Sequence, residues 1–170
     1  MNIKKSVFIL FLFAVAIPFT FAQEKASPAM TAEGTAGGAK ITINYSAPAV
    51  KGRTIWGDLV PLGQVWRAGA DEATTFSTSK DILIEGQKLP AGTYSFFIIP
   101  NEGYSTFIFN KVAKQWGAFN YDAAQDALRV NVPSQQTSTM EERLVYRINS
   151  DGFEVAWEYA KAAAKISPAN

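Results

Sequence analysis

Leu144-Val145-Tyr146-Arg147-Ile148-Asn149 and Phe153-Glu154-Val155-Ala156-Trp157-Glu158-Tyr159 flank the dipeptide Asp151-Gly152. In both segments large apolar residues recur at every second position. This alternation is typical of a β-strand with one buried face, and Asp-Gly is a common tight turn between antiparallel strands. The sequence therefore predicts a β-hairpin over residues 143–159.

Six further short segments alternate in the same way or are rich in β-branched and aromatic residues, as strands are. They are residues 40–46, 73–79, 82–85, 93–99, 104–110 and 128–132. The most hydrophobic is 93–99, so we expect it at the centre of the sheet with 104–110 as its hairpin partner. The chain has no long helical period. We therefore predict an all-β fold, an antiparallel β-sandwich, jelly-roll-like or barrel-like, of about eight strands.

The connections between these strands differ in character. Residues 49–67 have no clean periodicity but contain Trp56 and Trp66, so we expect one long loop that packs onto the domain, a kind of loop that often carries function. The polar segment 133–138 is predicted to be a loop. The alanine-rich residues 158–165 continue the last alternation, and we expect them to extend the last strand.

The N-terminal residues 1–22 are typical of a secretory signal peptide. Lys4 and Lys5 precede an apolar run that is too short to span a membrane, and Thr20-Phe21-Ala22 supplies small residues for cleavage before Gln23. The alternative is a membrane anchor that stays attached. We expect export to the periplasm or the cell exterior, no membrane span in the mature chain, a flexible arm at 23–38 and a single β-sandwich domain at 39–166.

Composition excludes several chemistries. The 170 residues contain no histidine and no cysteine, so a Ser-His-Asp triad, a thiolate nucleophile and histidine or thiolate metal ligands are all ruled out. Without Lys4 and Lys5, 14 basic residues face 15 acidic ones, which offers no electrostatic basis for binding nucleic acid. We expect no cofactor and no metal, and the oligomeric state is left open.

Several short motifs occur in a specific order along the mature chain. They are Ser27-Pro28, Asn44-Tyr45-Ser46-Ala47-Pro48, Lys51-Gly52-Arg53, Trp66-Arg67-Ala68-Gly69, Glu72-Ala73-Thr74-Thr75, Pro90-Ala91-Gly92-Thr93-Tyr94, Asn110-Lys111 and Gln115-Trp116-Gly117. In this order they resemble the bacterial domain-of-unknown-function family 2911, from about Ser27 to Glu158. The resemblance implies an exported protein and brings no assigned activity. Members often have asparagine where this chain has Asp71, so the pattern does not require an Asp71–Glu72 carboxylate pair.

The candidate site lies in and around the segment 65–75. Its residues are Arg53, Trp66, Arg67 and Glu72, with Trp116 as an aromatic wall. Indoles stack on sugar or planar ligands, and arginines hold carboxylates or phosphates bidentately. We therefore expect a small-molecule or carbohydrate ligand. The structural alternative is an internal Arg67–Glu72 ion pair that pins the long loop, with Trp66 as a core plug.

Three functions remain open on sequence alone. The first is a non-catalytic ligand-binding or envelope-associated module, with no catalytic residues. The second is a carbohydrate-active hydrolase that uses Glu72 and a second carboxylate, for which the candidates are Glu85, Glu102, Asp122 and Asp126. The third is a purely structural surface protein. A calcium site built from Asp71, Glu72 and loop carbonyls is a further alternative.

Overall fold

The computed structural model describes residues 25–169, so the predicted signal peptide and Gln23 lie outside the described residues. The described chain forms nine strands. They are β1 (Ala29–Ala36), β2 (Ala39–Ser46), β3 (Thr74–Thr78), β4 (Ile82–Ile84), β5 (Gln87–Leu89), β6 (Gly92–Pro100), β7 (Tyr104–Asn110), β8 (Asp126–Asn149) and β9 (Gly152–Pro168). One 3-10 helix, η1 (Ala123–Gln125), precedes β8. The prediction of an all-β fold is confirmed.

All strand pairs are antiparallel, in the order β1-β2-β3-β6-β7-β8-β9-β4-β5. The hairpin predicted around Asp151-Gly152 is formed, with Ile148 opposite Phe153 and Asn149 opposite Gly152. The predicted 93–99 and 104–110 hairpin is also formed as β6 and β7. The alanine-rich segment extends the last strand, since β9 reaches Pro168.

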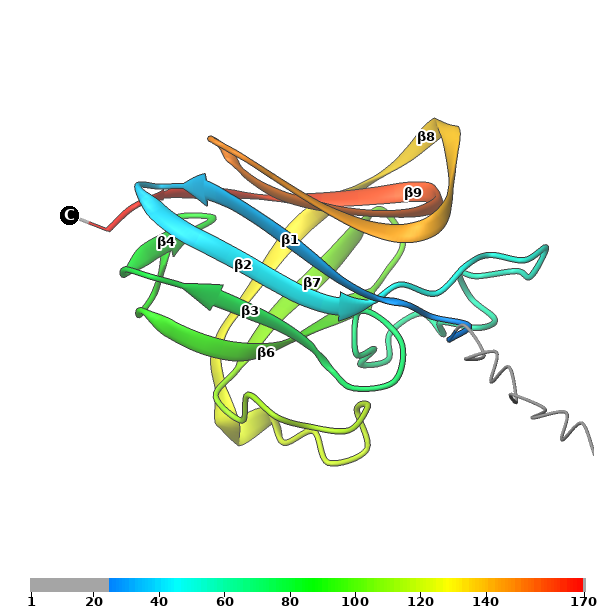
Figure 1. Ribbon diagram of the computed structural model, residues 1–170, viewed down its shortest axis with the longest axis horizontal. Coiled ribbons are helices and arrows are strands. Elements are labelled where there is room, and N and C mark those ends of the chain that lie inside the picture. Colours follow the sequence, from blue (N-terminus) through cyan, green and yellow to red (C-terminus); the bar gives the residue numbers. More distant parts are fainter. Residues whose placement is uncertain (1–24, 170) are drawn as a thin grey trace, which may run out of the picture.

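Strand β8 connects two layers. Its first part pairs with β7, as far as Pro133 opposite Tyr104, and from Ser134 onward it pairs with β9. In Figure 1 the long β8–β9 ribbon lies across one side of the molecule, over the layer of β1, β2, β3, β6 and β7. The sheet therefore folds over itself at β8, which gives the sandwich-like arrangement that the alternation predicts.

The core lies between these layers and is dominated by phenylalanines. Phe153 of β9 lies 5.2 Å from Phe76 of β3, 5.6 Å from Phe96 of β6 and 5.5 Å from Phe107 of β7, measured between ring centroids. These four rings are fully or almost fully buried. Tilted and edge-to-face packing at such distances is favourable for aromatic rings. Phe153 thereby links the β8–β9 hairpin to the strands of the opposite layer.

Two expectations about loops are wrong. The predicted arm at 23–38 contains β1, whose residues pair with β2 along their whole length, from Ala29 opposite Ser46 to Ala36 opposite Ala39. The residues of β1 are small, so they show no alternation of large apolar side chains. Their size allows β1 to pack closely against β8, because a Cβ on Gly34 would lie 2.7 Å from Cγ2 of Ile148. Residues 133–138, predicted as a loop, continue β8 with mostly exposed side chains.

Within residues 25–169, no helix is long and apolar enough to cross a membrane.

Candidate functional site

The long loop predicted between residues 49 and 67 belongs to the connection from β2 to β3 and packs onto the core. Ile55 and Val60 are buried, and the backbone of the loop closes a small turn in which the Val60 N–H donates to the Ile55 carbonyl at 2.8 Å. Trp56 and Trp66 both pack against the core. The loop therefore has a defined conformation, which holds the residues that follow it.

The segment 66–74 is fixed mainly by backbone hydrogen bonds. The Trp66 N–H donates to the Ile98 carbonyl at 2.8 Å, and the Ile98 N–H donates back at 2.9 Å. The Ala70 N–H donates to Ser46 at 3.1 Å, and the Thr74 N–H donates to the Arg67 carbonyl at 3.1 Å. These bonds hold the backbone on both sides of Arg67, so the direction of its Cα–Cβ bond does not depend on a hydrogen bond from the side chain.

Ala68 is the centre of this segment. It is fully buried with a positive φ of 55°, a strained conformation for a residue with a side chain. Its carbonyl accepts from Thr74 Oγ1 at 2.9 Å and from the Tyr146 hydroxyl at 2.7 Å. Burial raises the pKa of Tyr146 well above its usual range, so this hydroxyl remains a donor at all ordinary pH values. The next residue must be small, because a Cβ on Gly69 would lie 2.9 Å from Thr74 Oγ1.

Beside this segment lies a pocket of about 340 Å³ that we call the cationic pocket. Its lining includes three cationic residues and two indoles, namely Lys51, Arg53, Arg67, Trp66 and Trp157, and no acidic side chain. Apolar walls with a few convergent polar groups are typical of small-molecule sites, and a volume above 300 Å³ is in their usual range. The structure thus brings together Arg53, Trp66 and Arg67 of the predicted site.

The two arginines of the pocket have different roles. Arg53 donates from Nε to the Val50 carbonyl at 3.1 Å and from Nη2 to the Ala49 carbonyl at 2.5 Å, so it holds the preceding turn. The Arg67 side chain forms no hydrogen bond and no ion pair with any residue in the described part of the chain, and its Nε is buried without a partner. Its guanidinium extends toward the 111–122 loop, since a Cβ on Gly117 would lie 3.7 Å from Arg67 Nη1.

Glu72 and Trp116 lie apart from the cationic pocket. They form an isolated β-bridge in which the Ala73 N–H donates to the Gln115 carbonyl at 3.0 Å. Glu72 is exposed and lines a different pocket together with Lys114. Trp116 is 60% exposed. Among residues 25–169 no ion pair joins Arg67 to Glu72. The structural alternative from the sequence, an Arg67–Glu72 ion pair that fixes the long loop, is therefore not formed.

The loop that carries Trp116 is anchored by buried polar groups. Asn110 is fully buried, donates to the Asp122 carbonyl at 2.9 Å and to Asp126 Oδ1 at 2.8 Å, and accepts from Gln115 Nε2 at 3.1 Å. Tyr121 donates to Asp126 Oδ2 at 2.6 Å, and burial and this carboxylate raise the pKa of Tyr121 to about 12. This network fixes the loop on which Trp116 stands.

The pocket lined by Glu72 contains none of the four carboxylates proposed as its partner in hydrolysis, which are Glu85, Glu102, Asp122 and Asp126. Asp126 binds Arg129 at 2.6 Å in addition to Asn110, and Asp122 accepts from the Ala124 N–H at 2.9 Å as the N-cap of η1. Both therefore have structural partners. Within the described residues no group of three or more acidic side chains is placed to hold a metal ion.

Sequence reasoning did not select three residues at the cationic pocket. Lys51 lines the pocket, and it could have been predicted from the sequence because it is only two positions from Arg53. Trp157 of β9 is remote in sequence and its presence depends on the sandwich fold. Arg143 of β8 donates to the carbonyls of Ala47 and Ala26 at 3.0 and 3.4 Å, which ties the segment before β1 to the edge of the pocket.

Comparison with known proteins agrees with the motif order in the sequence. Neither the curated proteins nor the solved structures contain a match to this chain. Residues 27–166 match a family that is described as "Protein of unknown function (DUF2911)". This match spans the whole described fold from before β1 to the last part of β9. The chain therefore belongs to the DUF2911 family.

Proposed function

We propose that this protein is a non-catalytic binding module and that its ligand is a small organic anion held in the cationic pocket. The carboxylate or phosphate of the ligand meets the guanidinium of Arg67, and its planar or apolar body lies against Trp66. Acidic sugars have both features. The signal peptide predicted at residues 1–22 supports a role in the periplasm or outside the cell.

The observation that carries this proposal is the unpartnered side chain of Arg67. A half-buried guanidinium whose Nε is shielded from solvent loses hydration without gaining a hydrogen bond. Such an arrangement costs free energy, of the order of 1–3 kcal/mol for an unsatisfied buried group. Backbone hydrogen bonds hold the segment 66–74, so its conformation does not require the buried Arg67 side chain. The two Nη atoms are not fully buried, and a bound anion would supply charge-assisted hydrogen bonds to them.

The charges around the pocket support the same ligand class. Lys51 and Arg53 line the pocket together with Arg67, and no carboxylate lies among the lining residues. Three cations around one concave surface attract anions and repel cations. Lys51 forms no ion pair within residues 25–169, so its charge is available to the ligand as well.

The carbohydrate hydrolase has no comparable support. Glu72 does not line the cationic pocket, and the pocket has no carboxylate that would serve as general acid or base. An acidic sugar that enters the pocket would therefore be bound without being cleaved.

The test is isothermal titration of residues 25–169 with galacturonate, citrate and glucose 6-phosphate, and with galactose and glucose as neutral comparators. We expect at least one anion to bind and the neutral sugars to fail. Arg67→Gln should weaken the affinity roughly 10- to 100-fold, the value expected for loss of a charged hydrogen-bond donor. Arg67→Lys should be intermediate, because it keeps the charge and loses the bidentate geometry.

Lys114→Gln is the matched control. It removes the same charge from an exposed position in the pocket of Glu72, so the affinity should stay within about twofold of the unmodified protein. The thermal midpoint of each variant shows that it is folded. The proposal is wrong if none of the anions binds, or if Arg67→Gln and Lys114→Gln weaken binding equally.

A further inference from the structure

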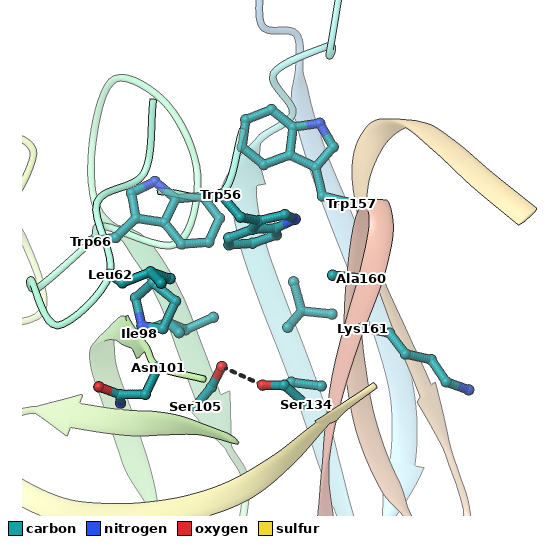
Figure 2. A pocket seen from close by; sticks show the side chains of 13 residues that line it. Trp56, Leu62, Trp66, Ile98, Asn101, Ser105, Ser134, Trp157, Ala160 and Lys161 are labelled. Atoms are coloured by element: carbon teal, nitrogen blue, oxygen red, sulfur yellow. Dashed lines mark hydrogen bonds between the residues drawn. The ribbon is translucent and has the colours of Figure 1, made fainter. Parts of the chain in front are cut away.

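A second pocket lies next to the cationic pocket and shares Trp66 and Trp157 with it. We call it the tryptophan pocket, and its volume is about 110 Å³. Figure 2 shows Trp56, Trp66 and Trp157 along one side, Leu62 and Ile98 beside them, and Ser105 and Ser134 on the opposite side. The site comes from four separate parts of the chain: the long loop, β6 and β7, the middle of β8, and β9.

The three indoles form one rigid wall. Trp66 and Trp157 are nearly parallel, with 15° between their planes and 5.9 Å between their centroids. Trp56 stands almost perpendicular to both, at 88° and 79°. The one polar atom of Trp66, Nε1, donates to the Gly69 carbonyl at 3.2 Å. Each ring is held by the other two, so this wall is formed before any ligand arrives.

Opposite the indoles the pocket has the hydroxyl pair of Ser105 and Ser134, together with the Asn101 amide, whose Nδ2 already donates to the Ile99 carbonyl at 3.2 Å. The Ser105 and Ser134 hydroxyls lie 2.9 Å apart and share one hydrogen bond, drawn as a dashed line in Figure 2. A pair of hydroxyls has two hydrogens and uses one of them in this bond. Within residues 25–169 neither hydroxyl has another partner, so one hydrogen and several lone pairs remain for a ligand.

The charged residue at the pocket does not contribute its charge to the interior. The Lys161 side chain extends away from the two serines in Figure 2, and its Nζ lies 3.8 Å from Glu154 Oε2. The other lining residues are mostly apolar, among them Leu62, Ile98 and Val155. The interior therefore fits a neutral ligand whose surface is mainly hydrocarbon and which has one hydrogen-bonding group.

We propose that the tryptophan pocket binds a single neutral six-membered aromatic ring bearing one hydroxyl, a ligand of the phenol class. The ring packs against the indoles, and the hydroxyl meets the Ser105–Ser134 pair. A dry protein cavity of about 150 Å³ lined by apolar side chains accepts benzene. The tryptophan pocket, at about 110 Å³, is smaller than that cavity but opens to solvent, so the ring enters it with one edge exposed. A sugar ring fits less well, because its many hydroxyls would face apolar walls without partners. This site does not depend on the function proposed for the cationic pocket.

The experiment follows the indole N–H signals of ¹⁵N-labelled protein by NMR during titration with 4-methylphenol. The chain has four tryptophans, so single Trp→Phe variants assign the four signals. We expect saturable shifts for Trp56, Trp66 and Trp157 and none for Trp116, which stands on a separate loop. Toluene should bind about three- to tenfold more weakly, because it lacks the hydroxyl, and glucose should cause no shift.

Two variants test the location. Ala160→Leu puts a larger side chain into the pocket and should weaken 4-methylphenol at least tenfold, with folding checked by the dispersion of the spectrum. Ser134→Ala removes one hydroxyl and should weaken 4-methylphenol three- to tenfold while leaving toluene unchanged, which decides the question if Ala160→Leu does not fold. Arg67→Gln should bind 4-methylphenol like the unmodified protein. The proposal is overturned if no saturable shift occurs, if Trp116 responds as strongly as the other three, or if Ser134→Ala changes neither ligand.

Discussion

The carbonyl of Ala68 offers a direct test of how the segment around Arg67 is held. It is buried and accepts two side-chain hydrogen bonds, from Thr74 Oγ1 at 2.9 Å and from the Tyr146 hydroxyl at 2.7 Å. Thr74→Val and Tyr146→Phe each remove one of these donors with little change in shape. No other donor to this carbonyl is found among residues 25–169.

The structure predicts that the two losses are not additive. Either single variant leaves the carbonyl with one partner, so the free energy of unfolding should fall by about 1 kcal/mol, the usual net value of one hydrogen bond. The double variant leaves a buried carbonyl with no partner, and the desolvation cost of an unsatisfied group is then added, roughly 1–3 kcal/mol. We expect the double variant to lose about 3–5 kcal/mol, which corresponds to a coupling of about 1–3 kcal/mol.

The measurement is urea unfolding of the four proteins in the cycle, followed by tryptophan fluorescence and by far-ultraviolet circular dichroism. Coincident transitions establish that unfolding is two-state, and equal slopes against urea allow the four free energies to be compared. An additive cycle would refute the reasoning, because it would mean that the Ala68 carbonyl finds another partner or is hydrated when both donors are removed.

Two further outcomes follow from the packing of β1 and from the buried tyrosines. Gly34→Ala should destabilise the fold by about 1–3 kcal/mol, because the new Cβ would lie 2.7 Å from Ile148 Cγ2; chemical unfolding should show a smaller cost in an Ile148→Ala background, and an equal cost in both backgrounds would contradict the contact. Burial is the main cause that raises the pKa of Tyr121 to about 12 and the pKa of Tyr146 well above its ordinary value of 10.0. The unfolded chain releases these protons near pH 10 while the folded chain keeps them, so stability is fully present below about pH 10 and falls as the pH rises through about 12. The thermal midpoint should decline over this range and decline less steeply in Tyr121→Phe, whereas a midpoint that is independent of pH would exclude the shift.

The strands with large alternating side chains were predictable from the sequence. Residues 143–159 have a strong period of two because one face of the β8–β9 hairpin packs on the core, where Leu144, Tyr146 and Phe153 are buried. Strand β1 was missed because its stability comes from pairing with β2 and from the close approach that Gly34 permits. Neither effect leaves a periodic pattern in a segment of small residues.

The candidate site was partly predictable for a similar reason. Arg53, Trp66 and Arg67 lie close in the sequence and on one connection, and they also lie on one pocket. Glu72 follows Arg67 by only five positions, yet the turn at Ala68 directs it elsewhere, and a positive φ at an alanine is not readable from residue type. Trp157 reaches the same pocket from β9, and only the three-dimensional arrangement shows that contact.

The continuity of β8 through both layers has a consequence for the order in which the protein folds. As the chain is synthesised, β1 to β7 emerge before the β8–β9 hairpin, whose Phe153 packs on Phe76, Phe96 and Phe107. The covering strands arrive only with the last quarter of the polypeptide. Long-range strand pairing is slow, and nascent chains with an open apolar sheet face associate readily. We therefore expect that premature termination within β8 leaves this apolar face without its covering hairpin and promotes aggregation of the truncated chain.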